Sequence, residues 1–112
     1  MALAECAFDT ELGVEADVRT VTSAAAPFGD IATLFGESAS RVVVSVTPAR
    51  MAELLELAAA SRVPAAQIGR VGGDRVRISI EGRSVVDESL SDIERIWSTA
   101  IDRYFEPERA IA

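Results

Sequence analysis

Alternating apolar and polar residues predict two half-buried strands in the chain. In residues 14–19, Val14, Ala16 and Val18 alternate with Glu15, Asp17 and Arg19, and residues 75–80 show the same period of two. The sequence Gly72-Gly73-Asp74 separates residues 75–80 from residues 67–71, so we expect these two segments to form a β-hairpin. A turn at Glu81-Gly82-Arg83 then leads into a further strand at residues 84–86.

The β-branched run of residues 41–46, with sequence RVVVSV, predicts a strand of a different kind. Its apolar positions are nearly continuous instead of alternating, which is typical of a strand buried on both faces. We therefore expect residues 41–46 to be the central strand of the sheet.

Four segments have the composition or spacing of helices: residues 2–8, 27–35, 48–61 and 91–105. The first has no capping residue before it, so we expect it to be a helix truncated at its N-terminus, in a chain that is a piece of something longer. Thr47 and Pro48 are typical of a helix start, and Gly36 of a helix end. Ser91 and Glu94 have the spacing of a capping box for the last helix.

The side chains expected to be buried lie on two of these helices. On the third helix, at residues 48–61, they are Met51, Leu54, Leu55 and Ala58. The last helix has an apolar stripe that we expect to lie on the sheet, made of Ile93, Ile96, Trp97, Ala100, Ile101, Tyr104 and Phe105.

This order of elements predicts an α+β fold, a mixed β-sheet with helices packed on it. A length of 112 residues suits one domain, which we place at residues 1–105, followed by a polar tail at residues 106–112.

Composition and charge exclude several classes of protein. The net charge of −7 argues against a nucleic-acid module, which would carry a basic patch. No apolar stretch is long enough to span a membrane, and no basic-then-apolar leader is present, so we expect a cytoplasmic protein.

The residue types that the chain lacks restrict its chemistry. It has no His, Lys or Asn, which leaves no imidazole base and no lysine for a Schiff base or a phosphate loop. Its one cysteine, Cys6, cannot form an internal disulfide, and its apolar neighbours predict a small buried side chain. We therefore expect this chain alone not to be an enzyme.

Two clusters of polar residues are candidate binding sites. Residues 37–41 gather Glu37, Ser38 and Arg41 before the predicted central strand, which suits either a phosphate or amide ligand or a solvated turn with a local ion pair. Arg70, Arg75 and Arg77 lie close together on the predicted hairpin, as either an anion-binding patch or a solvated face that guards an edge strand. No helix follows Gly73, so the glycines there indicate a turn and not a phosphate loop.

Several motifs, in this order along the chain, resemble phosphoribosylformylglycinamidine synthase, specifically its large synthetase subunit. They are ALAEC at residues 2–6, LFGESASRVVVSV at 34–46, VPAAQIGRVGGD at 63–74, and the closing helix at 90–105 with Trp97, Ala100, Arg103, Tyr104 and Phe105 in register. Together they cover nearly the whole chain.

The resemblance implies the C-terminal α+β domain of that synthetase, similar to the C-terminal domain of aminoimidazole ribonucleotide synthetase. It implies an enzyme that uses ATP, Mg²⁺ and a glutaminase subunit to convert an amide into an amidine in purine biosynthesis. This chain would wall the clefts of the ATP-binding domains and be inactive alone, with no cofactor of its own. Glu37, Ser38 and Arg41 are carried over as ligand-side candidates at a position where the family can hold a structural nucleotide, and none is expected to be a catalytic acid or base.

Two alternatives remain open at this point. One is a domain of another ATP-dependent synthetase of the superfamily, of the hydrogenase-maturation or selenophosphate type. The other is a free-standing small binding or dimerisation module. Because a truncated first helix would leave apolar surface uncovered, we also expect the isolated chain to self-associate.

Overall fold

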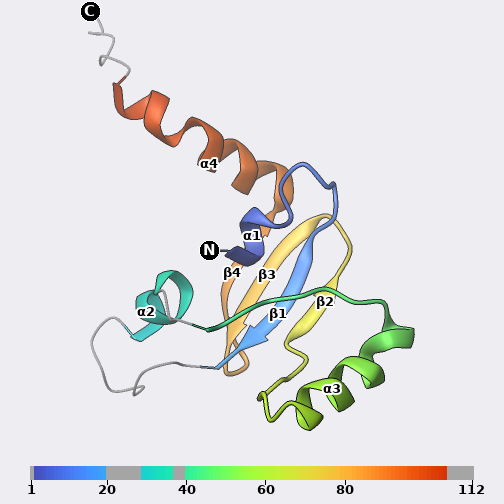
Figure 1. Cartoon of the computed structure of the whole chain (residues 1–112). Coiled ribbons are helices and arrows are strands. Elements are labelled where there is room, and N and C mark those ends of the chain that lie inside the picture. Colours follow the sequence, from blue (N-terminus) through green and yellow to red (C-terminus); the bar gives the residue numbers. More distant parts are fainter. Residues whose placement is uncertain (1, 20–28, 37–39, 106–112) are drawn as a thin grey trace, which may run out of the picture.

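The computed structural model describes residues 2–19, 29–36 and 40–105, and it confirms the α+β class. A four-stranded mixed sheet carries helices at its sides and ends (Figure 1). The helices are α1 (Ala2–Glu5), α2 (Gly29–Phe35), the short 3₁₀ turn η1 (Pro48–Arg50), α3 (Met51–Ala60) and α4 (Leu90–Phe105). None of the helices within these ranges is long and apolar enough to cross a membrane.

The sheet has the strand order β2-β1-β3-β4. Its strands are β1 (Val14–Val18), β2 (Gly69–Val71), β3 (Arg75–Ile80) and β4 (Arg83–Ser89). Strand β1 pairs in parallel with β3 and antiparallel with β2, and β4 pairs antiparallel with β3. The predicted hairpin between residues 67–71 and 75–80 is therefore wrong, because β1 lies between these two segments.

The glycine-rich link between β2 and β3 passes over the start of β1. The amide of Gly72 donates a hydrogen bond to the carbonyl of Gly13 at 2.9 Å, and the amide of Gly13 donates to the carbonyl of Gly73 at 2.8 Å. Gly73 has a φ of 68°, in the left-handed region that glycine adopts without strain. The glycines thus form a turn, as the sequence predicts, but the turn spans one strand instead of joining two neighbours.

The hairpin that does form joins β3 and β4. Its two-residue turn, Glu81-Gly82, has positive φ at both positions (48° and 83°), which is the type I′ geometry that matches the twist of paired strands. The amide of Gly82 also donates a hydrogen bond to Oδ1 of Asp17 at 3.0 Å, so this side chain of β1 stabilises the turn. The expected turn at residues 81–83 is confirmed.

The core lies on one face of the sheet, where the apolar side chains of the predicted strands meet α1 and the start of α4. It consists of Ala4, Ala7, Val14, Ala16, Val76, Ile78 and Leu90. The alternation in residues 14–18 and 75–80 thus predicted the buried face correctly. Cys6, however, is exposed and not buried, because it follows the end of α1 at Glu5 and lies in a turn outside the core.

The third predicted helix forms with bounds close to those expected, but its burial differs. No residue of α3 is buried, and Leu55 is 38% exposed. Met51, Leu54 and Ala58 are only half-buried, because α3 lies toward the β2 edge and not on the face of the sheet (Figure 1).

The closing helix α4 meets the core only through its first turns. Leu90 is buried and Ile93 packs beside it, but Trp97 is 51% exposed and Tyr104 is 83% exposed. Their predicted burial is therefore wrong, because the second half of α4 extends beyond the sheet (Figure 1). Trp97 contacts the core only at its edge, with its ring centroid 5.1 Å from that of Phe8.

The cap of α4 also differs from the prediction. Ser89 caps the helix: its hydroxyl accepts a hydrogen bond from the amide of Asp92 at 3.2 Å and donates to Oδ2 of Asp92 at 2.7 Å. The helix thus begins at Leu90, directly after β4 and without a loop, and the predicted pair Ser91 and Glu94 is not its capping box.

Residues 41–46 do not form the predicted central strand. They are extended and exposed, and no backbone hydrogen bond joins them to the described part of the chain. Val42 is 82% exposed, and Val43 and Val44 are each more than half exposed. The interior position between β2 and β3 is taken by β1, so this β-branched run lies outside the sheet.

Candidate functional site

The first candidate site, at residues 37–41, is described by the structure only at its end. Glu37 and Ser38 lie outside the described residues. Arg41 follows Ser40, whose φ of 65° is left-handed, and opens the extended segment. Its guanidinium is exposed and forms no ion pair with any residue in the described ranges. Arg41 is therefore free to meet an anionic group.

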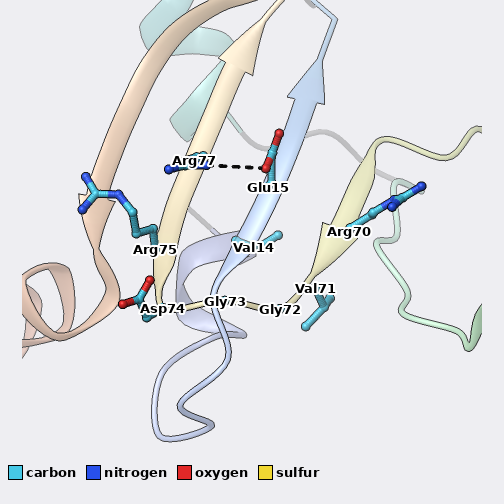
Figure 2. A pocket seen from close by; sticks show the side chains of 9 residues that line it. All are labelled: Val14, Glu15, Arg70, Val71, Gly72, Gly73, Asp74, Arg75 and Arg77. Carbon is cyan, nitrogen blue, oxygen red and sulfur yellow. Dashed lines mark ion pairs between the residues drawn. The ribbon is translucent and has the colours of Figure 1, made fainter.

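A hollow of about 280 Å³ lies at the end of the sheet where β2, β1 and β3 begin or end. Its lining includes all three arginines of the second candidate cluster (Figure 2). The residues are Val14, Glu15, Arg70, Val71, Gly72, Gly73, Asp74, Arg75 and Arg77. Strand register explains the gathering, because Glu15 on β1 lies opposite both Arg70 on β2 and Arg77 on β3.

The arginines of this hollow do not converge on one point. Figure 2 shows Arg70 directed away from Arg75 and Arg77. The latter two share one carboxylate, with Nε of Arg75 at 2.8 Å and Nε of Arg77 at 3.3 Å from Oδ1 of Asp87. A nitrogen of Arg77 also lies 3.9 Å from Glu15. The geometry favours a solvated network of cross-strand ion pairs over an anion-binding patch.

This network changes the acidity of its members. The hydrogen bond from Arg75 and the nearby positive charges hold the pKa of Asp87 below its ordinary value, and the same bond raises the pKa of Arg75. At the start of α4, the hydroxyl of Ser89 and the guanidinium of Arg95 likewise lower the pKa of Asp92. All of these groups are exposed, so each pair contributes little to stability.

Chemistry beyond ion pairing is sparse in the described ranges. They contain no group of three or more His, Cys, Asp or Glu side chains placed to hold a metal ion. Every buried side-chain nitrogen or oxygen there has a hydrogen-bond partner.

Two exposed apolar surfaces are the features that the sequence reasoning missed. One is the segment 42–46, and the other is the outer half of α4. The runs of apolar residues are visible in the sequence, but they predict a central strand and a helix packed on the sheet instead of exposed surfaces. Surfaces of this kind are typical of interfaces with other protein.

The sequence matches a family model over residues 1–81, and that model describes the C-terminal domain of AIR synthase related proteins. No solved structure matches the chain.

Several curated relatives share one name. The chain is 44% identical over 68 residues to the phosphoribosylformylglycinamidine synthase subunit PurL of Thermomicrobium roseum, an alignment of 61% of this chain and 9% of the relative. It is 33% identical over 101 residues to PurL of Alkaliphilus metalliredigens and 34% identical over 101 residues to PurL of Moorella thermoacetica, each covering 90% of this chain and 13% of the relative.

The chain thus spans about a tenth of the length of these relatives. The family model covers most of the chain, and the mixed sheet with its helices agrees with the α+β fold expected from the motifs. The chain belongs to the family of AIR synthase related proteins, as their C-terminal domain.

Proposed function

We propose that this chain works as the C-terminal α+β domain of a phosphoribosylformylglycinamidine synthase. The observation that carries the proposal is the similarity to PurL subunits over 90% of the chain, in addition to the family match. The whole enzyme would be a cytoplasmic ligase of purine biosynthesis. In its reaction the amide oxygen of formylglycinamide ribonucleotide is phosphorylated with ATP, and ammonia from a glutaminase subunit displaces the phosphate to give the amidine.

Within that enzyme, the role of the chain is to pack against the ATP-binding domains and wall their clefts. Residues 42–46 support this role, because their backbone amides and carbonyls have no partner in the described part of the chain. Three consecutive exposed valines, Val42, Val43 and Val44, also suit burial against another domain. A strand added to a neighbouring sheet would satisfy the backbone and cover these side chains together.

Glu37, Ser38 and Arg41 are the residues proposed to face a nucleotide bound with Mg²⁺. The donor set suits that ligand, because a guanidinium binds phosphate, a carboxylate binds Mg²⁺ and a hydroxyl bonds to either. Arg41 is exposed and without an ion pair among the described residues, which leaves it available for a phosphate. The remaining contacts would come from the other domains of the synthetase.

A chimera tests the role of the chain. The segment of Alkaliphilus metalliredigens PurL that matches this chain is replaced by the chain, and amidine formation is measured with ATP and ammonia. We expect an active chimera, and we expect Val43→Asp with Val44→Asp to reduce its activity by roughly tenfold or more, since two charges cannot be buried unpaired at a domain contact. Leu57→Asp on the exposed side of α3 is the matched control and should leave activity near the parent level.

An inactive chimera that is folded by circular dichroism would contradict the proposal. Equal loss in the Leu57→Asp control would show that the valines have no special role.

The nucleotide contact has its own test. Mg-ADP is titrated into the chimera and its variants by calorimetry. We expect one binding event of the parent chimera to be absent in Glu37→Ala and in Arg41→Ala. Arg62→Ala, another arginine without an ion pair in the described ranges, is the control. Unchanged Mg-ADP binding in Glu37→Ala and Arg41→Ala would show that these residues do not contact the nucleotide.

A further inference from the structure

The outer half of α4 carries the largest group of exposed apolar side chains in the described part of the chain. The exposed fractions are 52% for Ile96, 51% for Trp97, 73% for Ile101, 83% for Tyr104 and 75% for Phe105. Three of the five are aromatic, and such residues are enriched at the centres of protein interfaces.

The spacing along α4 is that of a helix built to pair with another helix. Leu90, Ile93, Trp97, Ala100 and Tyr104 follow one another at alternating intervals of three and four residues, the a and d positions of a coiled-coil seam. The first two positions pack on the core of the chain itself. The seam then continues past the sheet, where Trp97 contacts the ring of Phe8 and Tyr104 is 83% exposed.

We propose that α4 pairs with α4 of a second copy of this chain, antiparallel and across a two-fold axis near Ala100 and Ile101. The proposal does not rest on the proposed function, which concerns residues 42–46 and the nucleotide.

The exposed area agrees with a second copy as the occupant. An aromatic side chain offers about 150–250 Å², so the five exposed fractions amount to on the order of 600 Å² per copy. Two copies would bury on the order of 1,200 Å², the lower limit for specific, stable interfaces. A two-fold axis uses the same face twice, so no second apolar surface is needed.

The antiparallel direction follows from how α4 leaves the sheet. Ser89 ends β4 and Leu90 begins α4, so no linker separates the helix from the domain. A parallel pair would bring the two sheets to the same end of the seam, where they would collide. An antiparallel pair places them at opposite ends, sets Trp97 opposite Tyr104 of the partner, and aligns the helix dipoles favourably.

The oligomeric state of the full chain tests the pairing. Sedimentation equilibrium from about 1 to about 100 µM should show a monomer–dimer equilibrium for the parent chain. Ile101→Glu should raise the dimer dissociation constant by roughly tenfold or more, because a charge would lie beside the apolar seam at the two-fold axis. Leu57→Glu, at an equally apolar and 64% exposed position on α3, should leave the equilibrium unchanged.

Circular dichroism of each variant confirms that it is folded before the comparison is made. A parent chain that stays monomeric at the highest concentration overturns the proposal. Dimerisation of Ile101→Glu at the parent level, or equal dissociation of Leu57→Glu, overturns it as well, because the dimer would then use another surface.

Disulfide trapping tests the direction of the pair. In a Cys6→Ser background, Ala100→Cys lies beside the axis and should cross-link under mild oxidation. Tyr104→Cys should not, because the two copies of residue 104 would be seven residues apart along the seam, or about 10 Å. That separation exceeds the Cα distance of about 7 Å that a disulfide can bridge. Efficient cross-linking through Tyr104→Cys would show a parallel pair and contradict the antiparallel arrangement.

Discussion

Gly13 lies so close to Arg75 that a β-carbon on Gly13 would overlap the carbonyl oxygen of Arg75. The contact occurs where the link between β2 and β3 passes over the start of β1, and hydrogen bonds on both sides of Gly13 hold it there. The close approach of two backbones at this point lets β1 enter the sheet between its partners.

Replacing Gly13 with alanine should therefore be costly. The added methyl group has only rigid backbone to displace, so we expect Gly13→Ala to lower the free energy of unfolding by about 3 kcal/mol. At this chain length that is a fall of roughly 12 °C in Tm, measurable by thermal unfolding followed by circular dichroism.

Gly73→Ala is the matched control for this prediction. A β-carbon there would meet nothing within 4 Å, and the change costs only the positive φ of 68°, about 1 kcal/mol. Equal losses in the two variants would mean that the overlap at Gly13 is relieved by a backbone shift.

Asp87 should make the stability of the chain depend on pH at the acid end. Because the hydrogen bond from Arg75 lowers its pKa in the folded state, the folded chain binds a proton at lower pH than the unfolded chain does. Its contribution is fully present above the unfolded pKa of about 3.9 and is lost as the pH falls through the lower folded value.

Urea unfolding at several pH values checks this dependence. We expect the parent chain to lose stability more steeply below about pH 4 than Asp87→Asn, in which the titrating group is gone. Glu88→Gln removes a neighbouring carboxylate that forms no ion pair in the described ranges, and should keep the parent slope. Parallel curves for the parent and Asp87→Asn would contradict this prediction.

Ser89 should be the residue that caps α4. Ser89→Ala removes the hydroxyl that accepts from the amide of Asp92, and we expect a loss of about 1 kcal/mol in the free energy of unfolding. Ser91→Ala should cost much less free energy of unfolding. The hydroxyl of Ser91 forms only a long hydrogen bond of 3.4 Å with the hydroxyl of Ser89, and it bonds to no helix amide within the described ranges. Both losses are measured by urea unfolding. A larger loss in Ser91→Ala than in Ser89→Ala would contradict this prediction and support the capping box of Ser91 and Glu94.

Phe8 should control the environment of Trp97, which is the single tryptophan of the chain. Their ring centroids are 5.1 Å apart, so Phe8→Ala should expose more of the indole, shift its fluorescence emission to longer wavelength and increase acrylamide quenching. The spectra are compared at a concentration where Ile101→Glu and the parent give the same emission, so that dimerisation does not contribute. An unchanged spectrum in Phe8→Ala would mean that α4 does not contact this turn in solution.

Local patterns predicted the alternating strands at residues 14–18 and 75–80 well, but not their pairing. The alternation in residues 14–18 and 75–80 fixes which side chains face the core, and the structure agrees. Which strand lies beside which depends on contacts distant in sequence. The glycines at positions 72 and 73 suit a tight hairpin as well as a link across β1, so the sequence did not distinguish the two arrangements.

The same limit applies to the apolar surfaces and to the candidate site. The valines at residues 42–44 and the stripe on α4 have the composition of a core, and composition does not show whether the chain itself covers them. The arginines on β2 and β3 lie near one another as predicted, but Arg70 is directed away from the other two (Figure 2). Arg75 and Arg77 pair with acids that lie on other strands. Of the ligand-side candidates, the structure describes Arg41 only.

The place of β1 in the sheet also has a consequence for the order of events during synthesis. Val14 pairs with Val76, which the ribosome adds 62 residues later. At about 5–20 residues per second, the nascent strand waits several seconds before its neighbours exist. The β3–β4 hairpin, by contrast, closes within microseconds of its completion. Within this domain, folding during synthesis therefore begins at the β3–β4 hairpin, and β1 stays unpaired until its neighbouring strands have been made.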